Sequence, residues 1–477
     1  MISKLVQWTK DIIAELYPDK SDSAAVSVEM VTEIDTWASV FNNCPKWASK
    51  KNQVYTEGDA RSVCAELARL TTLELESQVS GSDRAEYINK VYQGVIEQID
   101  TYAEYGMAKG GLIMKPNPTA DGITVDFVQA DCFVPVSFDS SGRMTAAVFL
   151  DTKKRGSKYF RKLEAHNLTQ SGYRIINRAY ASSTDAILGN EIPLSSVDEW
   201  ADIAPDVTLP YIKEPLFGYF KVPFSNPIDN TSPLGPSVFA DALADGTLQL
   251  ADQQYSRIAR EYEITEPALF LATEYLKQDG IAGPKLPDGN KRIYREVEDA
   301  GGLHNGHGLF EVYSPAIRDT SLLAGLNRYK QDIEFKCGLS YGTLSDIQLV
   351  DKTATEIISS KQRSHSTVKK LQKALQTSLE QLVNAIDEQV SLYKLAPEGD
   401  YEVAFKWDDS ILIDSNTEQA IRMQEVQSGI VKPESYLMWR YGVSEEEAKD
   451  MMPDQNTTDY GADLFGGGGA GTDGGGV

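Results

Sequence analysis

Hydrophobic positions recur at helical spacing in two long segments between residues 318 and 395. In the first segment they lie three and four residues apart, at Leu322, Leu326, Tyr329, Ile333 and Cys337. The second segment carries a longer apolar stripe, formed by Val368, Leu371, Leu375, Leu379, Leu382, Ile386, Val390 and Tyr393. Because this spacing keeps one side of a helix apolar, it predicts two helices joined by a polar loop at 338–352. Poor helix formers at 364–367 predict a kink in the second helix.

The first 230 residues divide into a helical start and a strand-rich body. Helical spacing predicts helices at 28–50, 61–78 and 85–105. Short apolar runs with turn residues between them, such as the Pro-Asn-Pro string at 116–118, predict the following strands: 112–114, 123–128, 144–150, 159–165 and 172–180. Helices and strands in this order predict an α+β protein.

The remainder of the chain alternates long helices with small inserts. A helix-start signal at 230–237 opens a helix to about residue 265, terminated by Pro267. We expect its apolar side to hold Phe239, Leu243, Leu250, Tyr255, Ile258 and Tyr262. Further strands are predicted at 292–298, 309–313 and 401–407, and short helices at 417–429, 433–441 and 444–452. Ser444 and Glu447 form a capping box that opens the last of these helices.

A basic segment within the very long helix contrasts with an acidic chain. The 477 residues carry a formal net charge of -24, yet residues 357–379 contain no Asp or Glu. At about 100° per residue, Lys361 falls outside the side opposite the apolar stripe. The cations that lie on that opposite side are Arg363, Lys369, Lys370 and Lys373. This basic helix face is either an ordinary solvated surface or a rod that presents charge to a polyanion. The acidic chain as a whole excludes bulk attraction to DNA or to an anionic membrane.

Residues that would suggest catalysis or metal binding are sparse. Four cysteines are scattered without CxxC spacing: Cys44, Cys64, Cys132 and Cys337. We expect them to be buried thiols in a reducing cytoplasm. His304 and His307 are interpreted as loop polarity rather than metal ligands, and Asp408 with Asp409 as a strand-end turn. The chain lacks the GxxxxGK[ST], HExxH and GxSxG patterns, so we expect no enzyme and no cofactor. It also lacks an apolar run of about 18 residues, so no membrane partner is expected.

Six short strings, together with the order of the elements, resemble the portal proteins (head–tail connectors) of tailed bacteriophages. The strings are GGLIMK at 110–115, LFGYFKVP at 216–223, NTSPLGPSVF at 230–239, GLSYG at 338–342, KTATE at 352–356 and FKWDDSI at 405–411. Each string is short and chemically ordinary, whereas their joint order and spacing are specific. The chain is most similar to the portals of long-tailed phages that infect Gram-positive hosts.

The resemblance implies a division of the chain into the parts of a portal subunit. These are a wing at 1–230, a first stem helix at 231–266, a clip at 267–316, a second stem helix at 317–337, a tunnel loop at 338–352, a kinked helix with a returning wing strand at 353–414 and a crown at 415–465. The tail at 466–477 lies outside the resemblance, and its glycine-rich composition predicts disorder. The crown is short for the family.

The same resemblance implies a structural role in the virion. Portal subunits form a ring, usually of twelve copies, at one capsid vertex, and double-stranded DNA is packaged and ejected through it. The expected partners are that DNA, bound without sequence specificity, the terminase large subunit, a head–tail adaptor, and the major capsid and scaffolding proteins. Assembly is expected in the host cytoplasm. Two alternatives are a minor capsid or adaptor protein that forms no channel, and a nuclease or hydrolase with an unrecognised site.

Two sets of site residues follow from the resemblance. The tunnel loop is expected to touch DNA without reading bases through Ser340, Tyr341, Thr343, Ser345, Asp346, Gln348, Asp351 and Lys352. An ordinary surface loop is the alternative. The clip is expected to bind the adaptor through Lys291, Arg292, Tyr294, Arg295, Phe310, Val312 and Tyr313.

Overall fold

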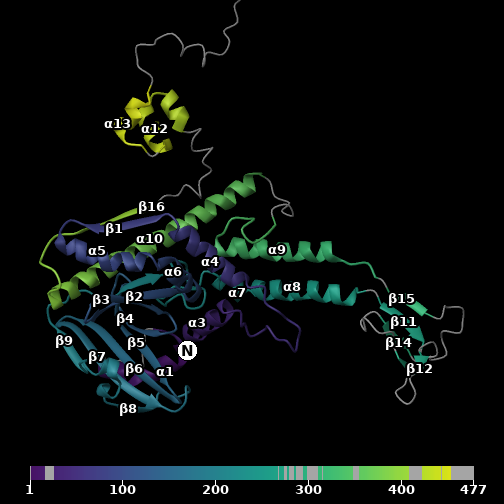
Figure 1. Cartoon of the computed structure of the whole chain (residues 1–477), viewed down its shortest axis with the longest axis horizontal. Coiled ribbons are helices and arrows are strands. Elements are labelled where there is room, and N and C mark those ends of the chain that lie inside the picture. The colour runs from purple at the N-terminus through teal and green to yellow at the C-terminus, as the bar shows by residue number, and fades with distance from the viewer. Residues whose placement is uncertain are drawn as a thin grey trace, which may run out of the picture. The chain divides into compact units, whose positions relative to one another are not determined.

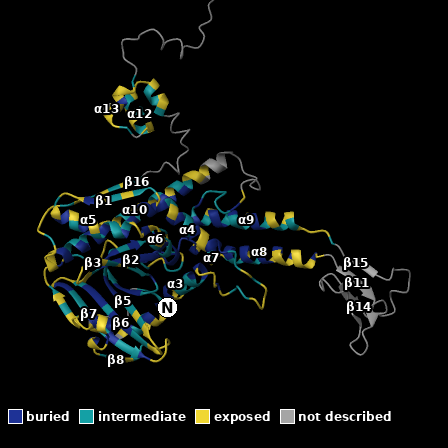
Figure 2. Cartoon of the chain, viewed as in Figure 1, coloured by how far each residue is buried: buried dark blue, intermediate teal, exposed yellow. Residues whose placement is uncertain are grey.

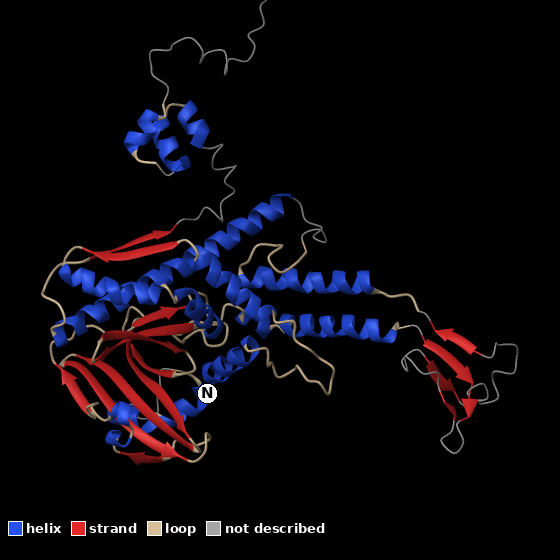
Figure 3. Cartoon of the chain, in the orientation of Figure 1, coloured by secondary structure: helices blue, strands red, loops and turns tan. Residues whose placement is uncertain are grey.

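Helices and strands alternate along the computed structural model, as expected for an α+β protein (Figure 1, Figure 3). The structure describes residues 2–16, 26–266, 268–272, 277–278, 284–285, 294–297, 310–313, 315–346, 354–407, 422–441 and 443–452. The chain forms two compact units, Met1–Trp407 and Asp408–Val477. Among the described residues, no helix combines the length and the apolar character that crossing a membrane requires.

The N-terminal part is helical, but its helices are shorter than the sequence predicts. They are α1 (Ile2–Trp8), α2 (Lys10–Leu16), α3 (Val28–Phe41), α4 (Asp59–Thr72), α5 (Asp83–Ile96) and α6 (Ile99–Lys109). The helix predicted at 28–50 ends at Phe41, because Asn43 adopts a positive φ of 57°. The helix predicted at 85–105 is interrupted after Ile96, and the helix predicted at 61–78 ends at Thr72.

Residues 75–80, beyond Thr72, form a strand in which every second residue points toward the core. Strand β1 (Leu75–Ser80) pairs antiparallel with β16 (Glu402–Trp407), so Leu75 lies opposite Trp407. Leu75 and Val79 pack on the core and Ser77 between them is half-buried, whereas Glu76 and Gln78 are exposed. This alternation is a strand pattern that the helical prediction at 61–78 missed. The predicted returning strand at 401–407 is confirmed.

Two antiparallel sheets form the body. The larger sheet has the order β4 (Phe133–Phe138), β5 (Met144–Arg155), β6 (Lys158–Thr169), β7 (Gly172–Ser182) and β8 (Asn190–Ile192), with β9 (Asp206–Leu209) also on β7. Two short 3₁₀ turns, Leu194–Ser196 and Asp198–Trp200, follow β8. The smaller sheet has the order β10 (Gly218–Lys221), β2 (Gly111–Thr119) and β3 (Gly122–Gln129). The strands predicted at 112–180 are confirmed, whereas β4, β8, β9 and β10 were missed.

The Pro-Asn-Pro string at 116–118, predicted to separate strands, lies inside β2. Strand β10 covers β2 only from Gly111 to Met114. Beyond Met114 one edge of β2 is therefore free of β10, and proline is tolerated at such an edge.

The longest helix, α10 (Ala354–Tyr393), packs across the smaller sheet and fills the centre of the body (Figure 2). Its predicted stripe from Val368 to Val390 is fully buried, whereas Tyr393, predicted to belong to the stripe, is 50% exposed. Residues 364–367 remain α-helical, so they do not interrupt the helix as a break. Gly218 of β10 allows the close approach, because a Cβ there would lie 2.3 Å from the Ser378 carbonyl oxygen.

Two antiparallel helices, α8 (Thr247–Ile264) and α9 (Asp319–Cys337), pack side by side (Figure 1). The single helix predicted before residue 265 is instead α7 (Ala240–Ala244) and α8, separated where Gly246 adopts a φ of +81°. Leu250, Tyr255 and Tyr262, expected on the apolar side of the predicted helix, are exposed, because the buried face of α8 holds Gln254, Ile258 and Glu261 instead.

Between α8 and α9 the chain forms short strands. They are β11 (Ala268–Ala272), β12 (Lys277–Gln278), β13 (Pro284–Lys285), β14 (Tyr294–Val297) and β15 (Phe310–Tyr313). Strand β11 pairs in parallel with β14 and antiparallel with β15. The predictions of strands at 292–298 and 309–313 are thus confirmed.

The second compact unit contains short helices. They are a helix at 422–427, α12 (Pro433–Tyr441) and α13 (Glu445–Asp450). The predicted capping box is present, since Ser444 and Glu447 exchange side-chain to backbone hydrogen bonds. Residues 417–421 of the predicted first helix lie outside the described residues.

Candidate functional site

The loop after α9 begins with a glycine that two constraints require. Gly338 adopts a φ of +73°, and its N–H bonds back to the carbonyls of Glu334 and Phe335. A Cβ at this position would lie 2.4 Å from Thr367 Oγ1 of α10. Only glycine satisfies both the left-handed backbone and this close approach. Leu339, which follows, is fully buried and holds the turn in the core.

A buried carboxylate fixes the next part of the loop. Glu334 on α9 is 0% exposed, and its Oε1 accepts hydrogen bonds from the backbone N–H groups of Leu344 at 2.6 Å and Ser345 at 2.8 Å. Ser345 Oγ donates to the other oxygen at 2.8 Å. Asn327, two turns earlier on α9, accepts from the Asp346 N–H at 2.7 Å. Residues 338–346 are therefore bound to α9 as a loop root.

Arg363 of α10 packs against this root as well. Its guanidinium lies 4.4 Å from the centre of the Phe335 ring and 5.3 Å from that of Tyr341. Both distances are those of cation–π contacts. Within the described part of the chain, Nε and Nη1 of Arg363 are buried without a hydrogen-bond partner. Arg363 thus joins three segments of the site.

The predicted basic helix face is only partly exposed. Lys370 and Lys373 face solvent, whereas Arg363 and Lys369 are half-buried. The prediction that Arg363 offers its charge to solvent is wrong, because the Phe335 and Tyr341 rings cover the guanidinium. Lys361, which the helical angle excluded from this face, is exposed as well.

The structure brings together part of the predicted tunnel loop. Ser340, Tyr341 and Thr343 are half-buried, Asp346 is exposed, and Ser345 is buried on Glu334. Ser345 is therefore a root residue, and its side chain does not face outward. The other predicted loop residues, Gln348, Asp351 and Lys352, lie outside the described residues.

The predicted adaptor-binding residues fall in a region where only strand pairing is described. Tyr294 and Arg295 lie on β14, and Phe310, Val312 and Tyr313 on β15. Lys291 and Arg292 lie outside the described residues.

The sequence pattern missed the residues that fix the root. Asn327 and Glu334 are buried on α9 together with Gln331, at steps of four and three residues. Polar residues at helical spacing beside an apolar stripe are a signal that these side chains bind something inside the protein. That signal was present in the sequence.

A second polar cluster joins the N-terminal part to the helix pair. Lys330 Nζ of α9 lies 2.6 Å from Glu57 Oε1, and Asp252 of α8 accepts from Trp47 Nε1 at 2.8 Å. Asp59, the first residue of α4, is buried beside them. Burial, reinforced by the charge of Glu57, raises the pKa of Asp59 to about 7. This cluster places a carboxyl group that titrates near neutral pH at the base of α8 and α9.

A third polar network lies inside the body. Glu164 accepts from Lys115 Nζ at 2.6 Å, and its Oε1 lies 2.7 Å from His166 Nε2. His166 Nδ1 lies 2.9 Å from the Tyr173 hydroxyl. Burial lowers the pKa of His166, so the neutral ring is favoured inside the sheet pair. The hydrogen bonds and opposite charges of the network satisfy these buried polar groups.

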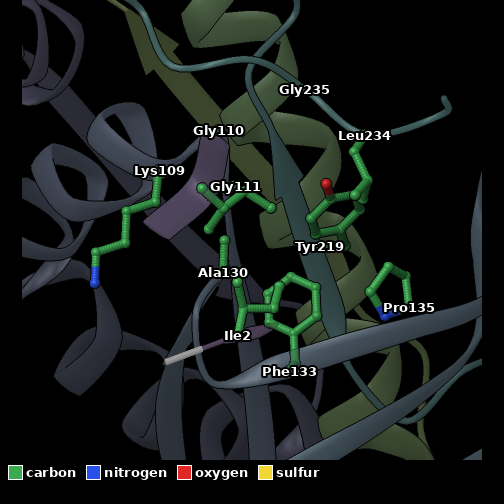
Figure 4. A pocket seen from close by; sticks show the side chains of 11 residues that line it. Ile2, Lys109, Gly110, Gly111, Ala130, Phe133, Pro135, Tyr219, Leu234 and Gly235 are labelled. Atoms are coloured by element: carbon green, nitrogen blue, oxygen red, sulfur yellow. The ribbon is translucent and has the colours of Figure 1, made fainter. Parts of the chain in front are cut away.

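A small opening beside the body core has too little volume for a ligand. It lies where the end of α6 meets β2 and β10, lined by Lys109, Gly111, Phe133 and Tyr219 among others (Figure 4). Its volume of about 10 Å³ holds at most one water molecule. The Lys109 ammonium group pairs with the Asp131 carboxylate at 2.7 Å.

In the part of the chain that the structure describes, no three His, Cys, Asp or Glu side chains gather as metal ligands. His304, His307, Asp408 and Asp409 lie outside it. All four cysteines are free, and Cys64 and Cys337 are buried as expected. Cys44 is exposed and Cys132 half-buried, so the expectation that all four are buried is wrong.

Comparison with protein families decides the class of the chain. The family described as phage portal protein, SPP1 Gp6-like, matches residues 79–459, which is well over half of the sequence. The chain belongs to this portal family. The match covers the body sheets, both helices of the pair, the loop root and α10. No curated protein matches the sequence.

Membership of the portal family fixes the general role. Portal proteins are structural components of the phage capsid that form an oligomeric ring and serve DNA packaging. The elements described above are therefore parts of a portal subunit, and the loop root belongs to a DNA-packaging ring. The similarity to phages of Gram-positive hosts stays a prediction.

Proposed function

We propose that this portal protein forms a twelve-membered channel at one capsid vertex through which double-stranded DNA is packaged and later ejected. The family match over residues 79–459 is the observation that carries the proposal. The ring serves first as the docking platform for the terminase large subunit and afterwards for a head–tail adaptor. Assembly takes place in the host cytoplasm with the major capsid and scaffolding proteins.

The charge of the chain supports transit of DNA without tight binding. Each phosphate that a lysine or arginine neutralises adds affinity through counterion release. With 70 acidic residues against 46 basic ones, the subunit carries few cations that would retain the duplex. DNA therefore slides through an acidic ring more readily than through a basic one.

The tunnel loop is the element that we propose contacts the DNA. Its root is held by Glu334, Asn327 and Arg363, so the position of the loop relative to α9 and α10 is constrained. A loop with a fixed root follows any movement of these two helices. We propose that the residues beyond Asp346 touch the phosphate backbone without base recognition.

Deletion of residues 347–351 tests this role of the loop. We expect the variant to assemble rings as the wild type does, because the root residues remain. We expect DNA packaging in a terminase-driven assay to fall at least tenfold. A control variant replaces the same five residues with glycine and serine, which separates the effect of loop length from that of the side chains. Packaging at the wild-type rate by the deletion variant would contradict the role.

The strands between α8 and α9 are the part that we propose binds the adaptor. Strands β14 and β15 flank β11 and leave the outer edges of this small sheet unpaired among the described strands. An unpaired sheet edge is a common site for adding a strand from a partner. The predicted residues on β14 and β15 belong to these two edge strands.

A further inference from the structure

Helix α8 exposes two different flanks that its own chain leaves uncovered. The basic flank consists of Leu250, Gln253, Arg257, Arg260 and Ile264, which follow one another at steps of three and four residues. The acidic flank consists of Tyr255, Ala259, Tyr262 and Glu263. The apolar members are well exposed, with Ile264 at 53% and Tyr262 at 48% (Figure 2). Large apolar side chains exposed along one helix indicate a contact surface.

The two flanks lie on either side of the face that packs on α9. That face contains Gln254, Ile258 and Glu261, which are all buried. At about 100° per residue, each flank is turned roughly 90° to 120° away from it, in opposite directions. A subunit with two such flanks is able to contact one neighbour on each side through α8.

The basic flank contains a hollow with unpaired cations. The hollow has a volume of about 150 Å³ and lies between the turn at residues 52–54 and α8. Arg260 Nη2 donates to Gln53 Oε1 at 2.8 Å, and Arg257 Nη1 to Gln254 Oε1 at 3.3 Å. Both partners are neutral amides, and neither arginine forms an ion pair within the described residues. Two guanidinium groups that line one hollow form a site for an oxyanion, and a carboxylate matches their geometry.

We propose that the basic flank of one copy binds the acidic flank of the next copy around the ring, with Glu263 of the neighbour seated against Arg260. The proposal rests on the ring of the proposed function. A ring requires a contact between two different surfaces of the same subunit, because each copy is related to the next by rotation. The two flanks of α8 supply one surface each, and their charges are opposite.

Rotational symmetry provides a second argument for this pairing. In the proposed arrangement α8 runs along the ring axis. Rotation about that axis leaves the height of every residue unchanged, so contacting residues on neighbouring copies of α8 have similar heights. Glu263 lies three residues from Arg260, a rise of about 4.5 Å, which long side chains span. By the same rule Tyr262 of the neighbour lies level with Arg260, and Tyr255 with Arg257. These are cation–π partners.

The apolar residues favour a second copy of the chain over DNA as the occupant. Leu250 and Ile264 lie at the two ends of the basic flank and are exposed. A phosphate backbone binds the arginines but leaves these aliphatic side chains in water. A neighbouring helix with Tyr255 and Tyr262 covers them while its carboxylate pairs with the cations.

Charge reversal with mixed copies tests the pairing. We expect Arg260→Glu alone, and Glu263→Arg alone, to lose ring formation at least tenfold at equal protein concentration, because like charges then meet at every contact. Coexpression of the two variants should restore rings of alternating copies, because both kinds of contact then join opposite charges. An ion pair within one helix cannot produce this restoration. Lys158→Glu, an equal charge change at an exposed position of β6, is the control that should assemble normally.

Size-exclusion chromatography with light scattering measures the rings, and circular dichroism establishes that each variant is folded. Single variants that assemble as the wild type does would overturn the pairing and leave the proposed function intact. Folded variants that remain monomeric after coexpression would also overturn it. Arg260→Glu rings that assemble but lose salt-dependent DNA binding would assign the arginines to phosphate instead. A wild-type chain that forms no ring overturns the proposed function itself.

Discussion

Among single residues, Asp59 is a buried carboxyl group whose surroundings disfavour its charge. It is 6% exposed, and its Oδ2 has no hydrogen-bond partner among the described residues. Burial, together with the neighbouring charges of Glu57 and Asp252, raises its pKa to about 7. Lys330 acts in the opposite direction but does not compensate. At neutral pH the folded protein therefore holds a carboxyl group at the point of losing its proton.

Replacement of Asp59 by asparagine should change how stability depends on pH. The folded pKa lies above the unfolded one, so the stabilisation from the protonated group is complete below about pH 4 and is lost as pH rises through about 7. The asparagine side chain does not ionise, so the Asp59→Asn variant keeps its stability as the pH rises. We expect the free energy of unfolding of the variant, relative to the wild type, to rise by on the order of 2 kcal/mol between about pH 5 and pH 8. Urea denaturation at both pH values measures this difference, and an equal difference at the two would contradict the burial argument.

A residue could be predicted from the sequence when its role leaves a periodic pattern along its own helix. The stripe of α10 from Val368 to Val390 was predictable, because burial on one helical side leaves a periodic pattern. Arg363 was placed on a solvent face, because the pattern within α10 does not reveal its contacts with the rings of Phe335 and Tyr341 in other segments. Periodicity along one helix does not predict a contact with a residue that is distant in the sequence.

At the scale of elements, the loop root shows how one helix fixes another segment. Glu334, Asn327 and Gly338 all belong to α9 or its end, and they hold residues 338–346 by hydrogen bonds and by close packing on α10. The buried carboxylate satisfies two backbone N–H groups and one hydroxyl that would otherwise lack partners. The first nine residues of the predicted tunnel loop at 338–352 therefore form its root.

Two substitutions of Glu334 separate its shape from its hydrogen bonding. Glu334→Leu removes the acceptor of the Leu344 and Ser345 N–H groups and leaves the one at Ser345 buried without a partner, which costs about 1–3 kcal/mol. We expect this variant to form rings whose residues 338–346 are cleaved much faster in limited proteolysis and whose DNA packaging is reduced several-fold. Glu334→Gln retains an acceptor oxygen and should package within about twofold of the wild type. Equal packaging by both variants would show that the root does not position the loop.

Element boundaries were less predictable than element types. The helices at 85–105 and before residue 265 were each predicted as one and are each divided, the latter at Gly246. Helical periodicity continues across such a break, whereas the turn depends on a single glycine conformation and on packing against other segments. Strand β1 was missed because its inward residues, Leu75 and Val79, also fit a helical count. Its partner β16 is more than 300 residues away, and only the fold brings the two together.

On the scale of the whole molecule, one family explains both the order of the elements and the charge of the chain. Helices α8 and α9, the strands between them, the loop root and α10 follow one another in the order that the portal resemblance implies. The general role was predictable because that order is carried by short strings spread over most of the sequence. The contacts between copies were not, because one chain shows only the surfaces that it leaves uncovered.

The central claim is that copies of this chain close into a ring with an open centre. Electron microscopy of the purified full-length protein, with class averages viewed along the symmetry axis, measures this directly. The account predicts closed rings of twelve copies around a central opening wide enough for a DNA duplex. Particles that remain monomers, or closed assemblies without a central opening, would contradict it.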